Sequence, residues 1–415
     1  MLANYIKIAW KVLLRHPFYT FITLFGISLT LTVLMLLTSF LDHLIGAHYP
    51  ETKRDRTLYV ERMVMSDSTA HSMMSGPMSF KFLNDYAKTL KTAERAAIFS
   101  YFNGSNAYVG SQKIKLNITF SDADFWRVAD FDFVEGKPFN EQNIKNGDYV
   151  AVITDNFKKQ YFSNSDEPVV GKNVEIENIN YKVLGVVKGS PITRPFTHAD
   201  IYFPYTAPKS NYQNTGMRGN FIAMILAKSK GDLKTVQSEF QSQIGRIPLP
   251  GMQGDFKYSE LEVRSDPYLE HFIMTILNGG PGLKNIFYGV IGFIMLMVMG
   301  LPAINLVNLN VGRILERASE IGVRKAFGAP IKTLMWQFIV ENVFITFIGG
   351  TIALILTYIL INIINASGWI AYADLAINLQ VFSVSIAVCL VFGLLSGVLP
   401  ALRMSKLSII EALKS

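Results

Sequence analysis

Charged residues at helical spacing form the most distinctive pattern in this chain. Between residues 313 and 324, arginine and glutamate recur three and four positions apart, which places them on one face of a helix. Opposite charges at these spacings stabilise a helix by about 0.2–0.5 kcal/mol per pair, and Gly328 and Pro330 then end it. The pattern predicts a charged amphipathic helix, either a docking surface for a protein or a solvated loop helix. The residues on this face are Arg313, Glu316, Arg317, Glu320 and Arg324.

The sequence contains none of the common patterns for catalysis or metal binding. The histidines between residues 42 and 285 are scattered, without metal-ligand spacing, and neither G-x-S-x-G nor H-E-x-x-H occurs. Gly171–Lys172 lacks the preceding glycine and the Ser/Thr of a phosphate-binding loop. The single cysteine, Cys389, excludes an internal disulfide framework. We therefore predict no catalytic residue, no cofactor site and no metal site in this chain.

The elements that position the charged helix are long apolar segments. Only 17% of the 415 residues are charged and mean hydropathy is +0.27, whereas a soluble domain has about 25% charged residues. A membrane span needs about 20 apolar residues. Four segments meet this requirement, namely 18–41, 286–311, 337–364 and 375–402. Glu341 near the start of the third is predicted to be a packed or interfacial carboxylate.

The segment before the first span carries Lys7, Lys11 and Arg15 four residues apart, which predicts a helix lying on the cytoplasmic membrane surface or a simple basic flank. The first apolar run is longer than the roughly 7–15 residues of a signal peptide core, so we expect an uncleaved anchor.

Positive charge indicates the orientation of these spans. Lysine and arginine gather in 312–336 and 403–415, whereas the short turn 365–374 carries only Asp374. By the positive-inside rule, both termini and 312–336 are cytoplasmic, and 42–285 lies outside. That long segment has 28 Lys+Arg and 27 Asp+Glu. The net charge of +7 therefore belongs to the cytoplasmic membrane surface, and a nucleic-acid groove is not expected.

Residues 42–285 show mixed helix and strand patterns. Strands are predicted at 113–120, 148–154, 201–204 and 221–227, a hairpin at 173–187, and helices at 79–90, 155–162 and 232–244. The methionine-rich stretch 63–78 is predicted to be a mobile loop with packing methionines, or alternatively a flexible apolar contact surface for a partner or cargo.

The fold class that follows is an α-helical membrane protein with four transmembrane helices and a large α+β extracytoplasmic domain inserted between helices 1 and 2. Its predicted segments are a cytoplasmic amphipathic N-terminal helix (1–17), span one (18–41), the extracytoplasmic domain (42–285), span two (286–311), a cytoplasmic segment (312–336), span three (337–364), an extracytoplasmic turn (365–374), span four (375–402) and a cytoplasmic tail (403–415).

The block Glu320–Ala329, EIGVRKAFGA, resembles the E-I-G-x-R-x-A-x-G-A signature of the FtsX/MacB-type ABC transporter permeases. Residues 399–403 and 411–414 resemble the ending of the same family, with Met404 and Ile409 in place of its alanine and proline. The external segment is similar to the MacB-like periplasmic core domain at 124–139, 150–172 and 181–187.

The resemblance implies that the cytoplasmic segment couples to a separate ABC ATPase subunit, which binds ATP and magnesium, while this chain is a non-catalytic subunit in the inner (plasma) membrane. It also implies pairing with a second permease, identical or different, within membrane lipid. A periplasmic adaptor and an outer-membrane channel remain open as further partners. The implied coupling residues are Arg317, Glu320, Ile321, Gly322, Arg324, Lys325, Ala326, Gly328 and Ala329.

The implied function is that of a mechanotransmission subunit of a type VII ABC transporter that exports or extrudes a substrate. Lipoprotein release and regulation of cell-wall hydrolases are the alternatives within the superfamily. A ligand-binding membrane receptor without an ATPase is the alternative from another class. A secondary transporter is disfavoured because spans one, two and four have no charged residue.

Overall fold

We describe a computed structural model of the chain, which divides into two compact units. The first comprises Met1–Asp42, Asn285–Trp369 and Asp374–Ser415, and the second comprises His43–Lys284 and Ile370–Ala373. The structure describes residues 17–67, 72–109, 112–163, 167–249, 258–277, 285–297, 331–368 and 375–380, with isolated residues before 17, at 283, 300 and 372, and between 382 and 394.

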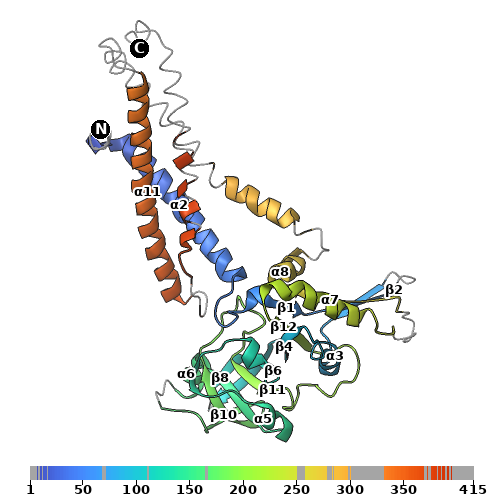
Figure 1. Ribbon diagram of the computed structural model, residues 1–415. Helices are drawn as coiled ribbons and strands as arrows, with labels where there is room; N and C mark the ends of the chain where they lie inside the picture. Colours follow the sequence, from blue (N-terminus) through green and yellow to red (C-terminus); the bar gives the residue numbers. More distant parts are fainter. Residues whose placement is uncertain are drawn as a thin grey trace. The chain divides into compact units, whose positions relative to one another are not determined.

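Two long apolar helices dominate the first unit (Figure 1). Helix α2 covers Pro17–Ile45 and helix α11 covers Ile331–Ser367. Pro17–Ile45 and, within α11, Ile339–Ser367 are each 29 residues long and apolar enough to cross a membrane. A shorter apolar helix covers Asn285–Met297. Apart from residue 300, the rest of predicted span two lies outside the described residues, as does half of predicted span four.

Helices α2 and α11 pack together through a glycine. A Cβ atom at Gly349 would lie 2.7 Å from Cγ2 of Ile27, so the missing side chain lets the two helices approach closely. Ile27 and Leu31 of α2 are buried against Ile345 and Ala353 of α11. Small residues at such contacts are typical of membrane helix pairs, because packing replaces the hydrophobic effect in lipid. Glu341 in α11 is buried, in keeping with its predicted packed role.

The second unit is built on an eleven-stranded sheet. Its strands are β1 (Thr57–Val60), β4 (Ala93–Ser100), β5 (Asn103–Val109), β6 (Gln112–Ser121), β7 (Phe133–Gly136), β8 (Val150–Thr154), β9 (Asn173–Ile176), β10 (Ile179–Val187), β11 (Ile201–Pro204), β12 (Phe221–Ala227) and β14 (Asp266–Pro267). A separate three-stranded sheet contains β13 (Glu260–Val263), β2 (Met63–Asp67) and β3 (Ser72–Gly76) in that order. The helices are η1 (Arg54–Arg56), α3 (Phe80–Tyr86), α4 (Phe125–Val128), α5 (Glu141–Asn146), α6 (Asp155–Tyr161), η2 (Lys230–Asp232), α7 (Leu233–Ile244) and α8 (Tyr268–Leu277).

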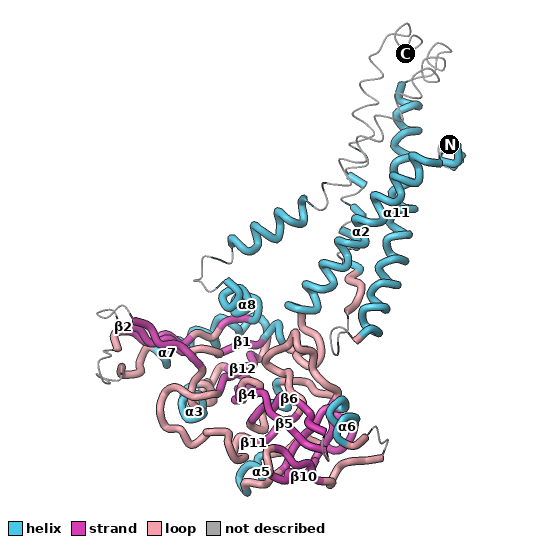
Figure 2. The backbone as a smooth tube through the Cα atoms, turned by 180° about the vertical axis from the view of Figure 1, so that it is seen from behind, coloured by secondary structure: helices cyan, strands magenta, loops and turns pink. Residues whose placement is uncertain are grey.

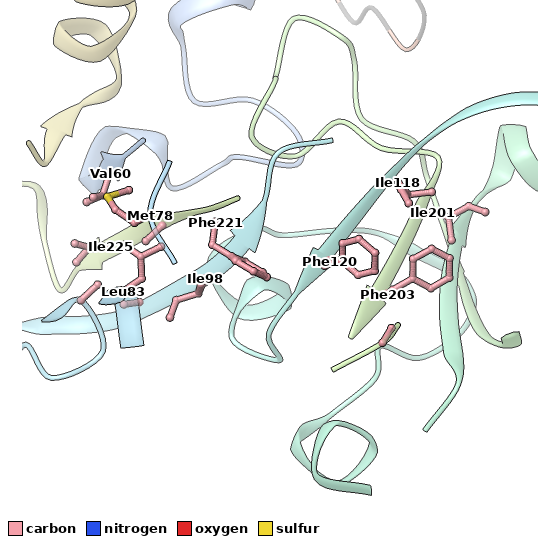
Figure 3. Packing of buried hydrophobic residues seen from close by; sticks show 14 of the residues in the cluster. Val60, Met78, Leu83, Ile98, Ile118, Phe120, Ile201, Phe203, Phe221 and Ile225 are labelled. Atoms are coloured by element: carbon pink, nitrogen blue, oxygen red, sulfur yellow. The ribbon is translucent and has the colours of Figure 1, made fainter. Parts of the chain in front are cut away.

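Six strands of the large sheet close into a ring. They pair in the order β11-β8-β10-β9-β5-β6, and β11 also pairs in parallel with β6. Ile118 and Phe120 of β6 are register partners of Ile201 and Phe203 of β11, and Figure 3 shows these four side chains together. Strand β7 pairs with β10 of the ring. Strands β4, β12, β1 and β14 extend from β6 as an open wing, which Figure 2 shows beside the ring.

Strand β12 is the centre of the wing, since all seven of its residues are buried. Its alternate side chains enter two cores: Phe221, Ala223 and Ile225 pack with α3 and α7, whereas Ile222, Met224 and Leu226 pack with α4 and α8. Burial on both faces explains why this strand is an unbroken apolar run in the sequence. The ten-residue helix α8 therefore covers one face of the wing.

Most of the strand and helix predictions for this unit are confirmed. The predicted strands 201–204 and 221–227 match β11 and β12 exactly in their bounds, and the predicted hairpin 173–187 is β9 and β10. The loop prediction for 63–78 is wrong, because β2 and β3 pair through most of it. Met63, Met65 and Met78 are buried, while Met73 and Met74 are exposed.

Candidate functional site

The residues predicted to couple to an ATPase lie outside the described residues, which resume at Ile331 with α11. The structure therefore neither brings them together nor separates them. These residues are Arg317, Glu320, Ile321, Gly322, Arg324, Lys325, Ala326, Gly328 and Ala329.

A different charged site surrounds the last turn of α2, where His43–Ile45 already belongs to the second unit. Arg194 Nη2 donates hydrogen bonds to the carbonyl oxygens of His43 and Gly46, at 3.1 and 3.2 Å. Arg54 Nη1 donates to the carbonyl oxygen of Leu44 at 2.7 Å. The last carbonyls of a helix have no partners within the helix and carry its negative dipole end. Two guanidinium groups thus hold and neutralise the end of α2.

One carboxylate completes this site. Glu51 Oε2 lies 2.9 Å from both Nε and Nη2 of Arg54 and accepts a hydrogen bond from the Tyr59 hydroxyl at 2.8 Å. Its Oε1 accepts from Thr197 Oγ1 at 2.9 Å. Glu51, Arg54 and Arg194 are all at least 96% buried. We call Glu51, Arg54, Tyr59, Arg194 and Thr197 the helix-end cluster.

The electrostatics of the helix-end cluster favour its charged form. Burial alone would raise the pKa of the Glu51 carboxyl, but Arg54 and Arg194 hold that pKa below its ordinary value. Burial, together with the neighbouring Arg54 charge, lowers the pKa of Arg194 to about 10, so its guanidinium remains protonated at neutral pH. Two positive charges thus face one carboxylate and the negative end of α2.

Sequence reasoning missed the helix-end cluster. Glu51 and Arg54 are three residues apart, but Thr197 is 146 positions from Glu51. The only local signal is an acid–base pair placed just after a predicted span. Nothing in the sequence marks Arg194 as buried, and arginine is rarely buried fully. Its Nε and Nη1 atoms have no hydrogen-bond partner among the described residues.

Two known protein families match this chain. The profile described as MacB-like periplasmic core domain matches residues 20–243, more than half of the chain, and FtsX-like permease C-terminal matches residues 292–409. The chain belongs to the MacB/FtsX family of ABC transporter permeases. The second unit is therefore the MacB-like core domain, an extracytoplasmic domain of an inner-membrane protein.

Several relatives of this permease align over most of it. A macrolide export ATP-binding/permease protein MacB from Hahella chejuensis is 23% identical over 98% of this chain and 59% of its own length. A pyoverdine export ATP-binding/permease protein PvdT from Pseudomonas fluorescens is 23% identical over 100% of this chain and 60% of its own length. The ABC transporter permease YknZ from Bacillus subtilis is 22% identical over 84% of this chain and 83% of its own length. The chain thus spans about 60% of the length of the first two.

Solved structures of two extracytoplasmic regions are also similar to this permease. The periplasmic region of MacB from Actinobacillus actinomycetemcomitans aligns with 54% of this chain and 94% of its own length, at a TM-score of 0.37 and 14% identity. The extracellular domain of YknZ aligns with 49% of this chain and 98% of its own length, at a TM-score of 0.36 and 14% identity.

The permease has a second charged contact at α8, the helix that precedes predicted span two. The Tyr268 ring lies under Arg54, with the guanidinium carbon 3.6 Å from the ring centroid, which is a favourable cation–π geometry. One turn later, His271 Nε2 lies 2.5 Å from Glu61 Oε2, and the Tyr101 hydroxyl donates to the same carboxyl group. Arg54 therefore contacts both the last turn of α2 and the first turn of α8.

Metal ligation is not supported by the described part of the permease. No group of three or more His, Cys, Asp or Glu side chains with metal-binding geometry occurs among the described residues. His43 instead lies 3.2 Å from Thr193 Oγ1 through Nε2, and His198 Nδ1 lies 2.8 Å from the Ser190 carbonyl oxygen. These contacts order the loop that carries Arg194.

Proposed function

We propose that this chain is the mechanotransmission permease of a type VII ABC transporter, in which ATP hydrolysis by an ATPase subunit moves the extracytoplasmic domain to export or extrude a substrate. Its partners would be that ATPase, which binds ATP and magnesium, and a second permease of the same or another kind. The printed names of two relatives, macrolide export and pyoverdine export, favour export over the other roles of the superfamily.

The observation that carries this proposal is the helix-end cluster. A helix can pass a displacement to a domain only if the end of the helix is fixed to that domain. The end of α2 is held by Arg54 and Arg194 through three hydrogen bonds, and α8 is held by the same Arg54 through Tyr268. A movement of α2 would therefore be passed directly to the extracytoplasmic domain.

The membrane unit supports the same mechanism. Helix α2 packs on α11 at Gly349, and α11 begins at Ile331, within the predicted cytoplasmic segment 312–336. The first span has no charged side chain between Phe18 and Leu41 that could line an ion path. Motion of the cytoplasmic segment would thus reach α2 through α11 without a pore for ions.

The coupling residues are tested by copurification from membranes. We expect an ATP-binding subunit to copurify with the wild-type chain, and we expect Glu320→Lys or Gly328→Trp to reduce its yield at least tenfold, because charge reversal or bulk would disrupt the docking helix. Glu175→Lys is the matched control, because it reverses the same charge at an exposed position on strand β9. Unchanged recovery with both variants would refute the coupling role.

The alternative functions are separated by the same preparation. A ligand-binding receptor would yield no ATP-binding subunit under any condition. A permease for lipoprotein release or cell-wall hydrolase regulation would yield the ATPase, but its extracytoplasmic domain would capture a lipoprotein or a hydrolase rather than a small molecule.

A further inference from the structure

Tyr372 forms a contact that neither the coupling helix nor the helix-end cluster explains. It lies in the predicted turn 365–374, yet it belongs to the extracytoplasmic unit. Its hydroxyl donates a hydrogen bond to Asp155 Oδ1 at 3.0 Å. The same oxygen accepts the backbone N–H of Gly189 at 3.0 Å. Asp155 Oδ1, at the start of α6, thus binds both Tyr372 and Gly189, and Gly189 is the second residue after β10.

Gly189 is shaped to receive the Tyr372 ring. A Cβ atom at this glycine would lie 2.1 Å from Cζ of Tyr372 and 2.3 Å from Cε2. Any other residue at position 189 would therefore displace the ring. Tyr372 itself has φ of 58°, the left-handed region that non-glycine residues rarely adopt. Such a conformation persists only where surrounding contacts hold it.

The ends of the turn are closed by a reciprocal pair. Asn365 Nδ2 donates to the Leu375 carbonyl oxygen and Asn365 Oδ1 accepts from the Leu375 N–H, both at 3.0 Å. Asn365 is part of the last turn of α11. Asn365 and Leu375 therefore hold together the two ends of the chain segment that contains Tyr372.

We propose that Tyr372 is a positioning residue, a latch that holds position 372, which follows α11 in the chain, against Asp155 and Gly189 of the extracytoplasmic unit and opens during each transport cycle. This inference rests on the proposed function. Unlike the helix-end cluster, the latch contains no buried ion pair. The Tyr372 side chain interacts with Asp155, with the Thr154 side chain and with the Asn156 backbone. Its ring contacts Gly189, and Tyr372 is only partly buried. A contact of this size, holding a strained backbone, is suited to breaking and re-forming.

The contact itself is tested by a double-mutant cycle, which needs no partner protein. We expect Tyr372→Ala and Gly189→Ala each to raise hydrogen exchange in the peptide covering 366–377 of the full chain in lipid nanodiscs, by at least fivefold. The double variant should exchange no faster than either single variant, because both remove one interaction. Gly104→Ala is the matched control, since its Cβ would meet no atom within 4 Å. Additive effects would refute the contact.

The opening step is tested by a covalent lock. Cys389 is the only cysteine, so Cys389→Ser gives a clean background for Gly189→Cys with Tyr372→Cys. A short, reducible bis-methanethiosulfonate linker between the two thiols should reduce the ATPase rate of the complex purified with its ATPase at least tenfold, and reduction should restore it. The same double-cysteine variant, treated with a methanethiosulfonate that has a single reactive group and cannot link the two thiols, is the matched control and should keep the rate of the untreated double variant.

The possible results separate the inference from the proposed function. Full activity of the locked protein would refute the opening step, even if the double-mutant cycle proves the contact. Absence of any copurifying ATPase would refute the proposed function and the opening step together, and would leave the contact as a static attachment.

Discussion

The middle of helix α2 is held mainly by apolar packing, with single hydroxyl contacts such as Thr32 Oγ1 to the Ala353 carbonyl oxygen at 3.4 Å, whereas its end is held by buried charged groups. In the middle, Ile27 and Leu31 contact α11 across Gly349. At the end, Arg54 and Arg194 bind the last carbonyls, and Glu51 pairs with Arg54. Apolar contact has no strong directional preference, whereas hydrogen-bonded ions require one geometry. The contacts at the last turn of α2 are therefore directional, whereas the contact in its middle depends mainly on the fit of apolar side chains.

The largest expected effect comes from removing the carboxylate of the helix-end cluster. Glu51→Gln would leave two buried guanidinium groups without a counter-ion, and breaking a buried ion pair costs about 3–5 kcal/mol. Chemical denaturation of the full chain in micelles, followed by circular dichroism, measures this loss. Glu94→Gln is the control, because its pair with Arg56 is partly exposed and worth about 1 kcal/mol or less. Equal losses would remove the distinction between the two sites.

Acid should weaken the end of α2 before its middle. The pKa of Glu51 is lowered from an ordinary value of 4.5, so its stabilising contribution is present above that pH and is lost as the pH falls through the lower, folded-state pKa. The free energy of unfolding of the wild-type chain should therefore fall below about pH 4.5 more steeply than that of Glu51→Gln. Parallel acid profiles would show that Glu51 does not contribute.

Filling the gap at Gly349 tests the apolar contact. Gly349→Leu would force the new side chain against Ile27, and overpacking of this kind costs about 1–3 kcal/mol. Gly292→Leu is the control, since a Cβ there meets no atom within 4 Å. The same denaturation measurement applies. If Gly349→Leu lowered the free energy of unfolding more than Glu51→Gln did, the apolar contact would contribute more to holding α2 than the helix-end cluster does.

The smallest effect is expected for a hydroxyl within the apolar contact. Thr357 Oγ1 donates to the Ala353 carbonyl oxygen at 2.7 Å and lies 3.7 Å from Met35 Sδ. Thr357→Val keeps the shape and removes the hydroxyl, and membrane hydrogen bonds contribute about 0.6 kcal/mol on average. A loss above about 2 kcal/mol in the same assay would show that polar contacts also hold the middle of α2.

Local patterns predicted much of the fold correctly. Strands β8, β11 and β12 and helices α6 and α7 follow from apolar runs and periodicity over a few residues. The stretch 63–78 was misassigned because serine and glycine interrupt its alternation, while β2, which pairs locally with β3, also pairs with β13 almost 200 residues later in the chain. Such distant pairing leaves no signal within a short window.

The sequence alone determined where the long apolar segments lie, that a near-neutral segment separates the first two, and the family, since each depends on composition or on a contiguous motif. Only the tertiary structure decided which charges are buried, how six strands close into a ring, and that Tyr372 lies against Gly189. Burial and contact depend on residues that come together in space from distant positions in the chain, and a sequence pattern does not say which of them meet.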